Sequence, residues 1–295
     1  MSGTGGVWSR QAAQWERVGA PLRPSAQDVA WHRRIAFELA SAGTRVASVT
    51  TAGGPDEKTV PDPVSRLRVL QLGVTPEIAR VEWPRGTRLV AVDLCADMIA
   101  RVWPSPPDAE VVQADWLAMP LADGTRDMVV SDGCFGVLQH PGAHRALLAA
   151  IGNILRDDGR FVFRIFTRPP QAELPAAVYE DALAGRIASF HAFKLRLLMA
   201  MQASSEAGVC TGDVWDELHR NGPSFEELSR AAAWPLELIE TIHAYRGQQT
   251  RYSFPRLAEL RALIADTALE EIACHVPDYE LGARCPTIVL QRLQR

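Results

Sequence analysis

Four short apolar segments between residues 67 and 132 each end at a glycine or an aspartate, and helical patterns separate them. They are residues 67–72 before Gly73, 89–92 before Asp93, 111–114 before Asp115, and 127–131 before Asp132. This alternation predicts an open parallel α/β sheet. In such a sheet the ligand crevice lies beyond the carboxyl ends of the strands, so the residues that end these segments are the candidate binding residues.

The flanking segments predict helices and a completed sheet. Residues 1–64 predict an N-terminal helical extension and linker, with Ser25 and Asp28 capping the second helix, Gly43 ending it and a loop at 50–64. Residues 65–168 form the predicted core, with a fifth strand at 160–166. Residues 169–254 predict a helical insertion without strands, with helices at 175–203 and 213–234. Residues 255–295 predict a helix and two strands, at 269–276 and 284–293, that complete the sheet.

Composition excludes several classes of partner. The net charge of −4, without a block of Lys or Arg, argues against a nucleic-acid partner. No apolar run approaches the roughly 18 residues that span a bilayer, so no membrane association is expected. The five scattered cysteines form no CxxC pair, and no signal-peptide pattern opens the chain, which together predict reduced thiols and a cytoplasmic location. The sequence leaves the oligomeric state open.

The order of several motifs resembles the class I S-adenosyl-L-methionine (SAM)-dependent methyltransferases. The motifs are Val-Leu-Gln-Leu-Gly at 69–73, Val-Ala-Val-Asp at 90–93, Ala-Asp-Trp at 114–116, the segment 119–131, and the segment 154–161. The resemblance covers residues 66–168 and extends to 255–293. It implies a Rossmann-like, mainly parallel seven-stranded sheet with an antiparallel last strand, and SAM as the cofactor.

The first loop departs from the pattern of that family. The family usually has a Gly-x-Gly-x-Gly loop, whereas this chain has Gly73-Val74-Thr75-Pro76-Glu77. Glycines let the backbone approach a ligand closely, so the approach here is expected to be wider. Thr75, Pro76 and Glu77 still suit a helix start.

The resemblance assigns cofactor-binding roles to the strand ends. Gly73 would turn the chain beside the ligand. Asp93 would accept hydrogen bonds from both ribose hydroxyls, or would cap the next helix. Asp115 would bind the adenine amino group, and Trp116 would cover the adenine face or pack on the sheet edge.

Two further residues are cofactor candidates, and two are catalytic candidates. Ser131 would lie beside the reactive sulfonium of the cofactor, and Glu77 could pair with the cofactor ammonium or face solvent. Asp132 could orient the cofactor or acceptor, act as a general base, or only precede the turn at Gly133. His191 is the preferred base because histidine titrates near neutral pH, although a histidine on a helix can be structural. No group of residues has metal-ligand spacing.

The insertion also contains aromatic and titratable residues that could line an acceptor pocket. They are Phe190, His191, Phe193, Trp215, His219, His243, Tyr245, Arg246 and Tyr252. The resemblance implies in-line transfer of a methyl group to a small organic acceptor. The alternatives are aminocarboxypropyl transfer or cyclisation of SAM, and a SAM-binding protein without catalysis. A nicotinamide dehydrogenase is disfavoured because no GxGxxG loop precedes the first helix.

Overall fold

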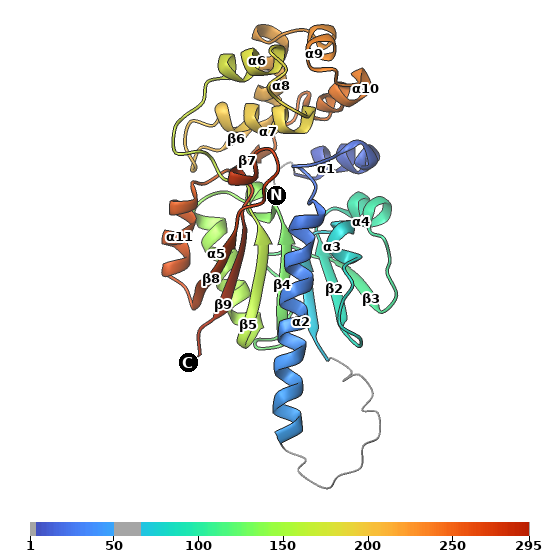
Figure 1. The fold of residues 1–295 in the computed structure, drawn as a ribbon, viewed down its shortest axis with the longest axis vertical. Helices are drawn as coiled ribbons and strands as arrows, with labels where there is room; N and C mark the ends of the chain where they lie inside the picture. Colours follow the sequence, from blue (N-terminus) through green and yellow to red (C-terminus); the bar gives the residue numbers. More distant parts are fainter. Residues whose placement is uncertain (1–3, 50–65, 295) are drawn as a thin grey trace.

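The computed structural model describes residues 4–49 and 66–294 and is built on a seven-stranded sheet with the order β3-β2-β1-β4-β5-β9-β8 (Figure 1). Strands β1 to β5 are parallel, and β9 runs antiparallel to both of its neighbours. The predicted fold class is therefore confirmed. The strands are β1 (Arg68–Leu72), β2 (Arg88–Asp93), β3 (Ala109–Gln113), β4 (Arg126–Asp132), β5 (Leu155–Arg164), β8 (Leu269–His275) and β9 (Thr287–Arg292).

The strand order reverses between β1 and β4, and this switch point places the predicted strand ends together. Leu72 at the end of β1 pairs with Val92 of β2 on one side and with Ser131 of β4 on the other. Gly73, Asp93 and Asp132 therefore stand at one edge of the sheet. A crevice at such a point is the usual ligand site of open α/β sheets.

Alternate residues of the buried strands face two separate cores. Val69 and Val130 pack with α2 (Ala26–Val49), whereas Leu70 and Val129 pack with α5 (Gly142–Ile154) and α11 (Leu257–Ala265). This period of two explains why these apolar segments form strands buried on both faces. Two short helices follow β1 and β2, namely α3 (Pro76–Ala79) and α4 (Ala96–Val102).

The helical insertion lies beyond the carboxyl edge of the sheet (Figure 1). Its own core includes Phe190, Phe193 and Trp234. Helix α1 (Thr4–Ala13) lies between the insertion and α4 and contacts both. A short 3₁₀ helix, η1 (Trp15–Arg17), follows α1. The elements of the insertion are α6 (Pro175–Leu183), α7 (Phe190–Ala200), β6 (Val209–Cys210), α8 (Thr211–Asn221), α9 (Phe225–Ala232), α10 (Leu236–Ile239), η3 (Glu240–Tyr245) and β7 (Arg251–Tyr252).

The two segments predicted as helical in the insertion are helical, but each consists of two shorter helices, because a glycine ends the first helix and a serine caps the second. Gly185 has a φ of +68° after α6, and the Ser189 side chain then caps α7 by accepting from the Ala192 amide. Gly222 follows α8, and Ser224 opens α9 with a capping box. The prediction of no strand was wrong, since the two-residue strands β6 and β7 pair.

The N-terminal predictions were partly right. The Ser25 amide and hydroxyl both donate to the Asp28 carboxylate, at 2.7 and 2.8 Å, which confirms the capping pair of α2. Helix α2 runs past Gly43 to Val49, so Gly43 does not end it. The loop predicted at 50–64 lies outside the described residues.

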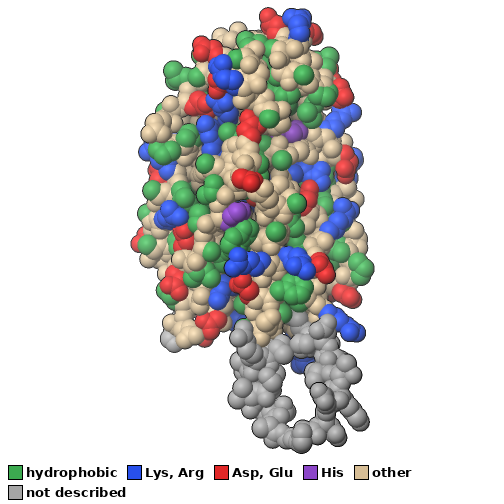
Figure 2. All heavy atoms as spheres, viewed as in Figure 1, with side chains coloured by type: hydrophobic (Ala, Val, Ile, Leu, Met, Phe, Trp, Pro, Cys, Tyr) green, Lys and Arg blue, Asp and Glu red, His purple; other side chains and the backbone are tan. Residues whose placement is uncertain are grey.

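The described part of the chain presents a mixed surface on the face in view. Acidic and basic side chains are interspersed there, without a stripe of one sign (Figure 2). None of the helices in residues 4–49 and 66–294 combines the length and the apolar character needed to cross a membrane.

Candidate active site

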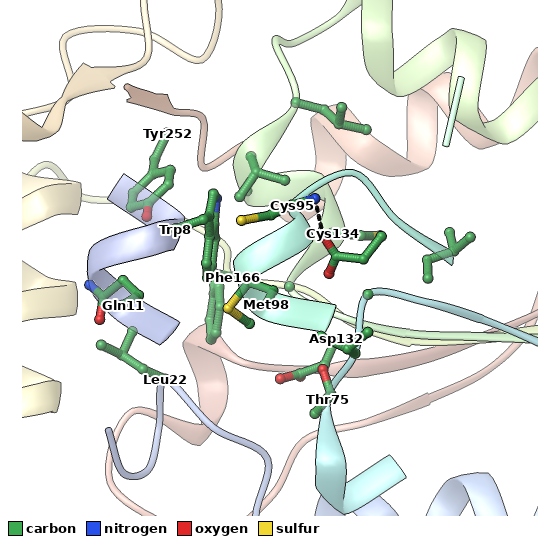
Figure 3. Close-up of a pocket in the computed structure, with 18 of the residues that line it drawn as sticks. Trp8, Gln11, Leu22, Thr75, Cys95, Met98, Asp132, Cys134, Phe166 and Tyr252 are labelled. Atoms are coloured by element: carbon green, nitrogen blue, oxygen red, sulfur yellow. Dashed lines mark hydrogen bonds between the residues drawn. The ribbon is translucent and has the colours of Figure 1, made fainter. Parts of the chain in front are cut away.

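A cavity of about 310 Å³ lies at the carboxyl edge of the sheet, between the strand ends, the N-terminal helices and the insertion. Figure 3 shows Trp8, Gln11 and Tyr252 on one side of it and Cys134, Asp132 and Thr75 on the other. The strand-end residues on its wall include Gly73, Asp93, Asp115, Trp116 and Asp132. The covering residues include Trp8, Gln11, Trp15, Val18, Leu195, Leu198, Tyr245, Tyr252 and Phe254.

Gly73, Asp93 and Trp116 meet at one point of this wall. Gly73 has a φ of +84°, a left-handed conformation that glycine adopts without strain. A Cβ atom at Gly73 would lie 3.7 Å from Cζ2 of Trp116 and 3.9 Å from Oδ2 of Asp93. The Trp116 indole is held by donating to the Val92 carbonyl at 2.7 Å. The turn therefore leaves open a space beside a carboxylate and an aromatic ring.

Asp93 is a half-buried carboxylate whose Oδ1 accepts from the Cys95 amide at 2.8 Å. Burial raises its pKa, and hydrogen bonds from the backbone of Cys95, Val74 and Leu94 oppose that rise. Cys95 occupies the N-cap position of α4, so Asp93 is not that cap. Asp115 also lines the cavity, and its Oδ1 accepts from the Leu117 amide at 2.9 Å.

The two residues that follow Gly73 in the loop are accommodated differently. Val74 is buried in a cluster with Ala12, Met98 and Val102, which joins α1 to α4. Thr75 occupies the N-cap position of α3, but its side chain makes no capping hydrogen bond. The Thr75 carbonyl instead accepts from the Gln71 side chain at 2.9 Å. The loop is therefore held by the apolar packing of Val74 and by the hydrogen bond from the Gln71 side chain.

Asp132 lines the cavity, and both of its carboxylate oxygens accept from one guanidinium. Arg164 Nε lies 2.6 Å from Oδ1, and Nη2 lies 3.1 Å from Oδ2. The Arg164 side chain is fully buried and also contacts Asp28 at 3.6 Å and the Tyr279 hydroxyl at 3.1 Å. Two aspartates around one arginine give this cluster a formal charge of −1 when all three groups are ionised.

Ser131 and Glu77 do not line the cavity. Ser131 is buried, and its Oγ lies 3.0 Å from the Cys134 sulfur. Glu77 accepts from Arg23 Nε through Oε1 at 2.6 Å, and its buried Oε2 has no partner among the described residues. The structure therefore joins Glu77 to the N-terminal extension.

His191 also lies outside the cavity wall, on the side of α7 that contacts the N-terminal segment. Its Nε2 lies 2.8 Å from the carbonyl oxygen of Arg17, and its buried Nδ1 has no partner in the described chain. Burial lowers the pKa of His191 to about 4, and the nearby Lys194 adds to this effect. The neutral imidazole donates from Nε2 to the Arg17 carbonyl. His191 therefore makes a contact with the backbone and does not face the cavity, where a base for the acceptor was expected.

Sequence reasoning missed most of the cover. Trp8, Gln11 and Trp15 come from the N-terminal helices, which carried no functional motif. Of the nine residues proposed for an acceptor pocket, Tyr245 and Tyr252 line the cavity. Trp8 and Trp15 stand seven residues apart, but that spacing also fits simple core packing. No group of three or more potential metal ligands occurs among residues 4–49 and 66–294.

A family model described as a methyltransferase domain matches residues 70–163. No curated protein matches the chain. A solved complex between the Haloferax volcanii Trm112 methyltransferase activator and a proposed methyltransferase matches with 13% identity, a TM-score of 0.50 and full coverage of both chains. A proposed zinc-dependent alcohol dehydrogenase of Rhodobacter sphaeroides matches with 14% identity and a TM-score of 0.53, over 97% of this chain and 98% of that one. A Methanosarcina mazei SAM-dependent methyltransferase matches with 13% identity and a TM-score of 0.47, over 77% and 93%.

The identities are below 25%, so the two matches with TM-scores of 0.50 and 0.53 show similarity of fold alone. The strand order, the antiparallel β9 and the cavity at the switch point define a Rossmann-like α/β protein with a cavity where this fold usually binds its ligand. Residues 70–163, which include most of β1, strands β2 to β4 and most of β5, match a methyltransferase domain.

Proposed function

We propose that this protein transfers the methyl group of SAM to a small organic acceptor held under the N-terminal helices and the insertion. One observation carries the proposal: a single cavity joins the strand-end residues Asp93 and Asp115 to the covering residues Trp8 and Tyr252. A methyl donor and an acceptor must lie in line, and a shared cavity provides that proximity.

The strand-end residues fit the nucleoside part of SAM. We assign the ribose to Asp93 and the adenine to Asp115 and Trp116, because their carboxylates and ring surround the space left by Gly73. SAM, when bound, supplies an activated methyl group. We assign no cofactor contact to Ser131 or Glu77, because neither residue lines the cavity.

The acceptor is proposed to be small and largely apolar because the cavity has a volume of about 310 Å³ and its covering side is mostly apolar. Leu195, Leu198 and Phe254 line it together with the aromatic rings of Trp8 and Tyr252. Small-molecule sites are mostly apolar, with a few polar groups that fix orientation. Gln11 and the Tyr252 hydroxyl are such groups.

The test is calorimetric titration with SAM and S-adenosylhomocysteine. Asp93→Ala should weaken binding at least tenfold, since it removes the proposed ribose acceptor. Asp123→Ala removes an exposed aspartate outside the cavity and should leave affinity unchanged. Failure of both ligands to bind the wild type would contradict the proposal.

Product analysis then separates the possible chemistries. Incubation with SAM and a mixture of small acceptors should yield S-adenosylhomocysteine. Formation of methylthioadenosine would instead support transfer or cyclisation of the aminocarboxypropyl group. Binding without turnover of any acceptor would support a SAM-binding protein without catalysis.

A further inference from the structure

The acceptor side of the cavity offers no protein base that titrates near neutral pH. No histidine of the described chain lines the cavity. Burial raises the pKa of the Cys134 thiol to about 12, and it also raises the pKa values of the Tyr245 and Tyr252 phenols. Asp132 is bound on both oxygens by Arg164, while Asp93 and Asp115 lie on the nucleoside side. The residues that line the cavity therefore provide no group to accept a proton from the acceptor near neutral pH.

A buried cation without a partner lies behind the acceptor side. Lys194 on α7 is fully buried, and its Nζ has no hydrogen-bond partner among the described residues. The Nζ atom lies 5.8 Å from the ring centroid of Phe190 and 5.5 Å from that of Tyr245, which lines the cavity. Leu195 and Leu198, on the same helix, also line the cavity.

The charge on Lys194 is retained at neutral pH. Burial lowers the pKa of Lys194 to about 8, so at pH 7 most molecules still carry the ammonium. The neighbouring titratable groups are His191, which is neutral at that pH, and the Tyr245 phenol, whose pKa is raised by burial. Aromatic rings compensate part of the desolvation of a cation. An anion in the cavity would compensate more, since charge interactions are strong in a medium of low dielectric constant.

The fixed charges thus have opposite signs on the two sides of the cavity. The Asp28–Arg164–Asp132 cluster, with a formal charge of −1, lies at the strand ends. Lys194 lies on the insertion side. This arrangement suits a cationic methyl donor at the strand ends and an anionic acceptor next to the insertion.

We propose that the acceptor is a flat apolar molecule with an ionised hydroxyl group of the phenolate type, and that Lys194 stabilises the anion. This inference rests on the proposed function. The proton leaves the hydroxyl to solvent before entry. The oxygen lone pair then forms the bond to the methyl carbon, and the electron pair of the carbon–sulfur bond stays on sulfur, so one negative and one positive charge disappear together.

The experiment measures binding, without turnover, in the complex with S-adenosylhomocysteine. The probe is 4-nitrophenol, whose phenolate form absorbs visible light and whose neutral form does not. Its apparent pKa on the protein should fall by about one unit, a tenfold preference for the anion. Lys194→Met should abolish this shift, and Lys194→Arg should keep it. Arg196→Met, on the same helix but paired with Glu173, is the control that should leave the shift unchanged.

The Lys194→Met variant is expected to fold. Lys194→Met removes an unpaired buried charge and keeps a long apolar side chain, so its stability should be equal to or above that of the wild type. An unchanged or raised pKa of bound 4-nitrophenol, or a shift that persists in Lys194→Met, would overturn the proposal. So would no binding of 4-nitrophenol to a protein that binds S-adenosylhomocysteine, or tighter binding of benzoate. Loss of S-adenosylhomocysteine binding would instead refute the proposed function.

Discussion

Asp132 and Arg164 end adjacent strands, and the guanidinium of Arg164 binds both carboxylate oxygens of Asp132 inside the protein. The two residues are direct partners in the register of β4 and β5. Arg164 extends the contact to Asp28 on α2 and to Tyr279, whose hydroxyl lies 3.1 Å from both oxygens of Asp28. One arginine therefore ties the floor of the cavity to the N-terminal extension.

Arg164→Met should be strongly destabilising, because it leaves the Asp28 and Asp132 carboxylates buried without a counter-charge. We expect a loss of about 3–5 kcal/mol in the free energy of unfolding, measured by denaturant titration. Arg261→Met breaks an exposed ion pair with Glu271 and should cost less than about 1 kcal/mol. Equal effects of the two substitutions would contradict the structural role of Arg164.

Gly73→Ala should affect both folding and cofactor binding. A Cβ at a φ of +84° strains the backbone, at a cost of roughly 1 kcal/mol or more in stability. It would also project into the space between Asp93 and Trp116, so the affinity for S-adenosylhomocysteine should fall about tenfold or more, a loss near 1.4 kcal/mol.

The matched control for that substitution is Gly124→Ala. Gly124 has a φ of +63°, and no atom lies within 4 Å of the Cβ that alanine would add. The backbone strain is therefore similar, but the cavity is untouched. Unfolding should become easier in both variants, while calorimetry should detect weaker binding only in Gly73→Ala. A parallel loss of affinity in Gly124→Ala would show that strain alone explains the effect.

The sheet was predictable from the sequence because strands buried on both faces read as apolar runs that end at turn residues. Gly73, Asp93 and Asp115 were found in this way, since the edge of a parallel sheet gathers residues that are distant in the chain. Local rules also found the capping pair of Ser25 and Asp28, which depends only on neighbours.

The acceptor side was not predictable for the opposite reason. Trp8 and Gln11 reach the cavity only because α1 packs on α4, a contact between segments some 90 residues apart that leaves no local signal. The buried pairing of Asp132 with Arg164 likewise depends on strand register. The sequence also does not distinguish a histidine that faces a ligand from one that contacts a backbone carbonyl, as His191 does.

Trp8→Ala should open the cavity where α1 covers it. Trp8 packs against the cluster of Val74 and Met98 and lines the cavity itself. Removing the indole should cost about 2–3 kcal/mol of stability and weaken binding of S-adenosylhomocysteine and of an acceptor probe. Trp83 is partly buried and packs against the core under α2, so Trp83→Ala should lower stability without changing affinity in calorimetry. Unchanged affinity in Trp8→Ala would place α1 outside the ligand site.

Stability should fall as the pH drops below about 6.5, because two buried histidines are neutral in the folded protein. Burial lowers the pKa of His144 to about 4, with a smaller effect from His140, and the pKa of His191 is also about 4. In the unfolded chain these histidines have pKa values near 6.5, so they bind protons between pH 6.5 and 4 while the folded protein does not. Proton binding therefore stabilises the unfolded state over this pH range. At pH 4 each histidine should lower the free energy of unfolding by about 3 kcal/mol.

His144→Gln tests this dependence at one residue. The Nε2 atom of His144 lies 2.8 Å from the Phe135 carbonyl, so Nε2 donates and Nδ1 accepts from Nδ1 of His140 at 3.2 Å. A proton added to Nδ1 of His144 would therefore meet another N–H group. Denaturant titrations between pH 8 and 4.5 give the free energy of unfolding at each pH, and its slope with pH reports the number of protons taken up on unfolding. This number should be lower by up to one in His144→Gln than in the wild type. His219→Gln, at an exposed site, should keep the slope of the wild type, and so would His144→Gln if His144 were already charged in the fold.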